Sequence, residues 1–151
     1  MRPVSRRESL ALVAQATALT LVGAATPAYS APADAAAEIA KFVGGAALEP
    51  GKITLDLPEI AENGNAIPLA IDIESPMTAE DNVTDVLVLA DANPWPRVAS
   101  FHLTPLSGRA AVATRIRLAG TQTVSIVAKT NAGRFLIAQR QVKVTIGGCG
   151  G

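Results

Sequence analysis

The sequence has very few of the residues that metal sites and nucleophilic enzymes use. Its 151 residues include one cysteine, Cys149, and one histidine, His102. Two such residues cannot supply the three or four Cys and His ligands of a zinc site. A Ser-His-Asp triad or a Cys-His pair would have to use His102. These shortages count against an enzyme, and we expect no catalytic residue, metal or cofactor.

Aromatic residues and net charge are also scarce. Aromatic side chains make up 3% of the chain, and 13 basic residues balance 13 acidic ones. Proteins that bind nucleic acids combine basic surfaces with aromatic stacking platforms, so we expect no nucleic-acid partner. After the first thirty residues, no window approaches the roughly 18 to 20 apolar residues of a membrane span. We therefore expect no membrane association.

The first thirty residues predict an export signal. A basic start that contains Arg6 and Arg7 precedes an apolar stretch over residues 10–25, and Ala28 and Ser30 are the small residues that signal peptidase requires. The arginine pair resembles a twin-arginine signal, and an ordinary secretory signal is the alternative. We predict that the remaining chain is exported to the periplasm, an oxidising compartment.

Residues 31–146 predict one domain made of a short helix followed by strands. A helix over residues 34–43 ends at Gly44-Gly45, and its apolar residues Ile39, Phe42 and Val43 form one stripe that could pack on a sheet. From residue 53 the apolar residues alternate with polar ones, which is typical of strands. The seven predicted strands are 53–57, 67–73, 85–89, 98–104, 111–118, 123–129 and 135–146.

Seven short strands separated by turn signals predict an all-β fold, an immunoglobulin-like antiparallel β-sandwich with one short N-terminal helix. A closed barrel is the alternative. No pair of cysteines can bridge the sheets, and aromatic residues are few. The core must therefore consist of Val, Ile, Leu and Ala side chains.

The last predicted strand is followed by Gly147, Gly148, Cys149, Gly150 and Gly151. Glycine is costly to fix because it loses the most backbone freedom, so residues 147–151 predict a flexible arm. Structural cysteines are buried and inert, whereas a thiol between glycines is exposed and able to enter a narrow cleft. No His, Arg or Lys lies within five residues of Cys149. An unassisted thiol is only a few per cent thiolate at neutral pH, which favours a carrier over an enzyme.

Two other interpretations of the ending stay open. The domain could be a structural immunoglobulin-like module whose Cys149 only forms an intermolecular disulfide. The terminal Gly150-Gly151 pair also resembles ubiquitin-like thiocarboxylate carriers, but those require ATP-dependent adenylation, and an exported all-β domain does not fit that route.

A histidine, a tryptophan and a pair of arginines allow further predictions from the sequence. His102 lies mid-strand with neighbours that face the other way, which predicts a surface or partner-facing side chain. Trp95 lies between two prolines and predicts a loop anchor or part of an interface. Arg115 and Arg117 share a strand face. Such a pair of arginines usually only faces solvent, and the alternative is that it attracts anionic groups.

Motifs over most of the chain after the signal resemble one known family. They are the ending 142–151 and the segments 75–78, 93–94, 101–105, 107–110, 114–119 and 121–124. On these motifs the chain resembles SoxY, the sulfur-carrying subunit of the periplasmic thiosulfate-oxidising Sox system.

The resemblance implies that Cys149 is the covalent attachment point for sulfur intermediates and that the domain forms a heterodimer with SoxZ. It implies transient contact with SoxAX, a haem enzyme that couples thiosulfate to the thiol as an S-thiosulfonate. SoxB then hydrolyses off sulfate and leaves a persulfide. Where a sulfur dehydrogenase is present, it oxidises the outer sulfur. The carrier itself is expected to hold no cofactor.

Overall fold

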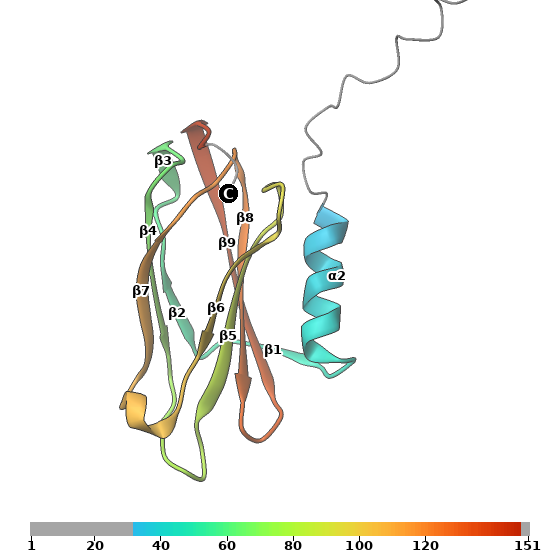
Figure 1. Cartoon of the computed structure of the whole chain (residues 1–151), viewed down its shortest axis with the longest axis vertical. Coiled ribbons are helices and arrows are strands. Elements are labelled where there is room, and N and C mark those ends of the chain that lie inside the picture. Colours follow the sequence, from blue (N-terminus) through green and yellow to red (C-terminus); the bar gives the residue numbers. More distant parts are fainter. Residues whose placement is uncertain (1–31, 149–151) are drawn as a thin grey trace, which may run out of the picture.

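The computed structural model describes residues 32–148 as two sheets that face each other, with one helix outside the larger sheet (Figure 1). No helix among these residues is long and apolar enough to cross a membrane. The elements are α2 (Pro32–Val43), β1 (Leu48–Pro50), β2 (Ile53–Asp56), β3 (Ile60–Asn63), β4 (Ile67–Ile73), β5 (Val83–Ala90), β6 (Arg97–His102), the 3₁₀ helix η2 (Pro105–Ser107), β7 (Ala110–Ile116), β8 (Gln122–Thr130) and β9 (Phe135–Ile146).

The larger sheet has the strand order β1-β9-β8-β5-β6, and the smaller sheet has the order β2-β4-β7. The predicted β-sandwich with a short N-terminal helix is confirmed. Two strands were not predicted, β1 and β3, and both pair with β9 in the parallel direction, so the sandwich is not purely antiparallel. β1 has only three residues, and three of the four residues of β3 are exposed, so neither strand shows the alternation of buried and exposed residues that marks a strand in the sequence.

Alternating side chains fill the space between the sheets. In β4 the inward residues Ile67, Leu69, Ile71 and Ile73 are each at most 2% exposed. They meet the inward side chains of β5 and β8 in one cluster of aliphatic residues. Hydrophobic burial therefore holds the two sheets together without a disulfide, as the composition predicts.

The helix α2 covers the outer face of the larger sheet. Its residues Ile39, Phe42 and Val43 pack with Leu87 and Phe135 in a second apolar cluster. The rings of Phe42 and Phe135 meet edge to face, with centroids 5.7 Å apart. The predicted packing of the helix stripe on a sheet is confirmed, and it explains why the larger sheet is apolar on both faces.

An ion pair joins the helix to the edge of this sheet. Glu38 Oε2 accepts a hydrogen bond from Arg97 at 2.9 Å, and Glu38 Oε1 accepts one from Lys41 at 3.4 Å. The hydrogen bond from Lys41, and then the one from Arg97, hold the pKa of Glu38 below its ordinary value. Folding therefore favours the ionised form of this carboxyl group.

Replacing Glu38 with glutamine is expected to lower stability slightly at neutral pH and not at all in strong acid. A lowered pKa stabilises the folded chain above the ordinary pKa of glutamate, and this contribution is lost as the pH falls through the lowered value. The effect is small because the pair is exposed to solvent and screened. Urea unfolding of both chains at about pH 7 and about pH 3 measures it. An equal difference at both pH values would contradict the assignment.

Candidate functional site

The last strand, β9, is held in the sheet almost to its end. It pairs with β8 along most of its length, and its final residues pair with β3, with Ala61 opposite Val144 and Asn63 opposite Ile146. Val144 is 8% exposed, so the core still holds the strand two residues before it ends. This end lies at the upper end of the sandwich in Figure 1, where the segment between β7 and β8 crosses from one sheet to the other.

Three chain segments meet at this end through backbone hydrogen bonds. The Gly64 N–H donates to the Ile146 carbonyl at 2.8 Å, and the Leu118 N–H donates to the Gly64 carbonyl at 2.9 Å. The Gly148 N–H donates in turn to the Leu118 carbonyl at 2.9 Å. We call residues Gly64, Leu118, Ala119, Gly147 and Gly148 the glycine cluster. It fixes the backbone up to the residue before Cys149.

Glycine is required in this cluster because the backbones approach too closely for a side chain. A Cβ on Gly64 would lie 2.2 Å from the Leu118 carbonyl oxygen. A Cβ on Gly147 would lie 2.1 Å from the Ala119 carbonyl oxygen, and one on Gly148 would lie 2.6 Å from that of Gly64. Real Cβ contacts are essentially never this short. Close packing, and not only backbone freedom, therefore accounts for glycine at 147 and 148.

This finding changes the interpretation of the predicted arm over residues 147–151. Its first two glycines have contacts with the domain, which the sequence pattern did not indicate. Cys149, Gly150 and Gly151 lie outside the described residues, and so does the predicted signal over residues 1–30. The flexibility of the arm and the role of Cys149 stay predictions.

Buried amide side chains hold the crossing segment in place. Asn93 Oδ1 accepts the Ala119 N–H at 2.9 Å, and Asn93 Nδ2 donates to the Arg117 carbonyl at 2.9 Å. Gln122 Nε2 donates to Asn93 Oδ1 at 2.9 Å and to the Gly120 carbonyl at 3.1 Å. Asn93 is 3% and Gln122 is 4% exposed, so solvent does not compete for these bonds. The backbone that binds Gly148 is thus fixed from inside the domain.

The structure does not bring His102 to this end. His102 ends β6 beside η2, at the opposite end of the sandwich (Figure 1). Its ring Nδ1 lies 2.6 Å from Asp85 Oδ1, and its side chain is 81% exposed. The predicted surface position is confirmed, and the ring is too far from the end of β9 to act as a base for a thiol there.

The structure places Trp95, Arg115 and Arg117 around one groove. The groove has a volume of about 490 Å³ and lies between the open edges of the two sheets. Its lining consists of Asn93, Trp95, Arg97, Val98, Arg115, Ile116 and Arg117. Sequence reasoning named three of these residues but could not group them, because they come from two separate segments.

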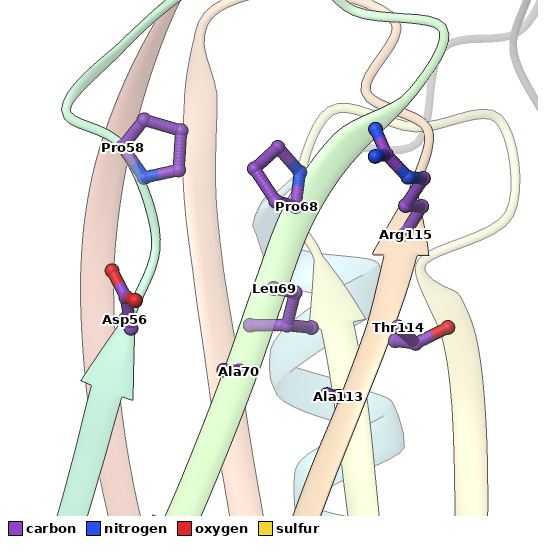
Figure 2. Close-up of a pocket in the computed structure, with 8 residues that line it drawn as sticks. All are labelled: Asp56, Pro58, Pro68, Leu69, Ala70, Ala113, Thr114 and Arg115. Atoms are coloured by element: carbon purple, nitrogen blue, oxygen red, sulfur yellow. The ribbon is translucent and has the colours of Figure 1, made fainter.

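A second hollow, of about 400 Å³, lies on the outer face of the smaller sheet (Figure 2). Its lining consists of Pro58, Pro68, Ala70 and Ala113 together with Asp56, Leu69, Thr114 and Arg115. Figure 2 shows the guanidinium of Arg115 extending past the end of β7, so this residue borders both hollows. None of the described residues that line this second hollow carries a thiol, an imidazole or an amine.

The fold and the end of β9 define an immunoglobulin-like β-sandwich in which the only cysteine follows a fixed point of the backbone. The chain is similar to the solved sulfur carrier protein SoxY from Chlorobium limicola f thiosulfatophilum, with 31% identity and a TM-score of 0.63, over 76% of this chain and 98% of that one. The sequence model of the protein family "Sulfur oxidation protein SoxY" matches residues 39–149 of this chain. The chain belongs to the SoxY family, as the resemblance predicted.

Superoxide reductases share the fold alone. The superoxide reductase (neelaredoxin) from Ignicoccus hospitalis is 12% identical with a TM-score of 0.55, over 62% of this chain and 80% of that one. A putative superoxide reductase from Thermotoga maritima is 14% identical with a TM-score of 0.54, over 64% of this chain and 93% of that one. No curated protein sequence matches the chain.

Proposed function

We propose that this protein is a covalent carrier of sulfur intermediates in thiosulfate oxidation and that Cys149 is the attachment point. The observation that carries the proposal is the fixed backbone up to Gly148, directly before the only cysteine of the chain. The hydrogen bonds hold this backbone at one end of the sandwich, so the chain reaches Cys149 from a defined point. Membership of the SoxY family supports a role in sulfur oxidation.

The loading step joins the Cys149 sulfur to the outer sulfur of thiosulfate. The thiol loses its proton, two electrons leave, and the product is a cysteine S-thiosulfonate with one negative charge. The family scheme assigns this oxidation to the haem enzyme SoxAX, which takes up the electrons. SoxB then adds water to the terminal sulfur, which releases sulfate and a proton and leaves a persulfide. Where a sulfur dehydrogenase is present, it takes up the electrons removed from the remaining outer sulfur, and water supplies the oxygens of the sulfonate that results.

The partner proteins, and not this domain, carry out the chemistry in this proposal. His102, the only imidazole of the chain, lies at the other end of the sandwich from Gly148 (Figure 1). The domain therefore supplies a fixed support for the thiol, and its imidazole is too far away to activate that thiol. A glycine on each side of Cys149 suits entry into the narrow active sites of several enzymes.

The carrier is assigned to the periplasm, with export by a twin-arginine-type signal over residues 1–30, and to a heterodimer with SoxZ. The basis is the family, whose Sox system is periplasmic, together with the arginine pair at Arg6 and Arg7. Twin-arginine export moves folded proteins, so the two subunits could cross the membrane as an assembled pair.

The mass of the intact protein from cells given thiosulfate tests the carrier function. We expect additions that match a thiosulfonate or extra sulfur atoms, that lie on the peptide containing Cys149 and that a reductant removes. The same protein from cells grown without thiosulfate is the control. A mass that shows only an unmodified thiol or a disulfide between two chains would favour the structural module instead.

A further inference from the structure

The groove lined by Trp95, Arg97, Arg115 and Arg117, which we call the arginine groove, has the chemistry of a site for a sulfur-bearing anion. Val98 and Ile116 also line it, and Ile116 is 3% exposed. The three arginines are exposed, and Trp95 is 73% exposed although its flanking residues Pro94 and Pro96 are half-buried. The groove therefore combines an apolar floor, an accessible aromatic ring and several guanidinium groups.

The positive charge of the arginine groove is not neutralised within residues 32–148. Arg97 pairs with Glu38, but Arg115 and Arg117 are in none of the ion pairs between described residues. The whole chain has equal numbers of acidic and basic residues, so this local excess does not reflect a generally basic protein. Two like charges on one strand face repel each other, and a bound anion would relieve that repulsion.

The groove lies within reach of whatever Cys149 carries. Arg117 directly precedes Leu118, whose carbonyl accepts the Gly148 N–H at 2.9 Å, and Cys149 follows Gly148 in the chain. One extended residue adds about 3.3 Å, and each S–S bond of an adduct adds about 2 Å. The same buried amide, Asn93, lines the groove and binds the Arg117 carbonyl, so both sites are built on one fixed segment.

We propose that the arginine groove binds the sulfonate-bearing group on Cys149 between its visits to the enzymes. The inference rests on the carrier function proposed above and extends it to a site on the carrier itself. Guanidinium groups bind planar or tetrahedral oxyanions through paired hydrogen bonds, so Arg115 and Arg117 hold the sulfonate oxygens. The divalent sulfur atoms lie against the ring of Trp95, since sulfur makes favourable contacts with aromatic rings.

The sulfonate group of the cargo then decides whether the groove holds it. An S-thiosulfonate presents to the arginines three oxygens that share one negative charge. Hydrolysis that releases sulfate removes all three and leaves a persulfide, which has no sulfonate for Arg115 and Arg117 to bind. The groove therefore binds the carrier's loaded form and releases it after hydrolysis, without a change in the fold.

Chemical loading of the full-length chain tests the groove without any partner enzyme. The Cys149 thiolate attacks tetrathionate, forms the S-thiosulfonate and releases thiosulfate. Trp95 is the only tryptophan, so its fluorescence reports on the groove alone. We expect loading to change the Trp95 emission and about 1 M salt to reverse most of the change. Two controls are expected to leave the Trp95 emission unchanged. One is the chain with carboxamidomethylated Cys149, which carries a neutral adduct, and the other is a Cys149→Ser chain given tetrathionate.

The double variant Arg115→Gln/Arg117→Gln is expected to load to the same mass but to lose the change in emission. A thiol reductant is expected to remove its adduct about tenfold faster, because charge-assisted hydrogen bonds no longer hold the group. The matched control is Arg109→Gln/Arg134→Gln, which removes the same charge from arginines paired with Asp72 and Glu49. These arginines flank β7 and β9 at the opposite end of the sandwich, and this variant is expected to behave as the unchanged chain.

Equal emission and equal reduction rates in the unchanged chain and the Arg115→Gln/Arg117→Gln variant would overturn the inference. So would the same emission change with the neutral adduct. Neither result would affect the carrier function, because that is judged by the mass of protein from cells given thiosulfate. Conversely, an unmodified Cys149 in those cells would overturn the carrier function even if tetrathionate-loaded protein bound the groove.

Discussion

Cells in which Cys149 is replaced with serine are expected to oxidise thiosulfate no faster than cells that lack the protein. A serine hydroxyl cannot form the sulfur–sulfur bond through which an intermediate is attached, and the chain contains no other thiol. The variant should also show no reductant-labile mass on its last peptide. Thiosulfate consumption and intact mass, measured on the same cultures, check both expectations.

The fold and export of this variant are expected to be unchanged, because the apolar core involves β9 only as far as Val144. Equal unfolding midpoints would show that the fold is unchanged. A second variant, Cys149→Ser/Leu106→Cys, tests the position of the thiol. Leu106 is 98% exposed on η2, at the opposite end of the sandwich, so the new thiol is accessible but lacks the glycine cluster. We expect no recovery of oxidation. Normal oxidation by Cys149→Ser would contradict the carrier function, and loss of a dimer without loss of oxidation would favour the structural module.

The fold could be predicted from the sequence to the extent that its elements are long and periodic. The helix α2 and seven strands have apolar residues at regular spacing, and each lies where the pattern predicts it within a few residues. The short strand β3 shows no such pattern, because three of its four residues are exposed at the edge of the fold. The Asn and Gly residues of the segment 62–65 are typical of a turn. The structure divides this segment between the end of β3 and the loop after it.

Because β3 was not predicted, the close packing of the glycines before Cys149 could not be predicted either. Pairing of β3 with β9 brings Gly64 against Gly148, more than eighty positions away in the sequence. Backbone freedom is a local property that a glycine run shows directly, whereas a close backbone contact depends on the packed fold. The arginine groove could not be predicted for the same reason, since residues 93–98 and 115–117 meet only through the sheet edges.

Gly64→Ala is expected to destabilise the domain by about 1–3 kcal/mol, the usual cost of forcing an extra carbon into a packed site. Its Cβ would lie 2.2 Å from the Leu118 carbonyl oxygen and 2.5 Å from the Gly148 nitrogen. Both are backbone atoms, so no flexible side chain can move away. The Leu118 and Gly148 segments must separate instead, which breaks the hydrogen bonds of the glycine cluster.

Gly120→Ala is the matched control, because it adds the same methyl group next to the cluster where nothing lies within 4 Å of the new carbon. It is expected to change stability by no more than about 0.5 kcal/mol. Denaturant unfolding measures the two values, and hydrogen exchange of the Leu118 and Gly148 amides shows where Gly64→Ala acts. If Gly64→Ala unfolds like Gly120→Ala and retains protection of both amides, the backbone before Cys149 is not fixed by the glycine cluster. The other outcome is that protection is lost at both amides and thiosulfate oxidation falls while export continues. The carrier then requires a fixed backbone before its thiol as well as the thiol itself.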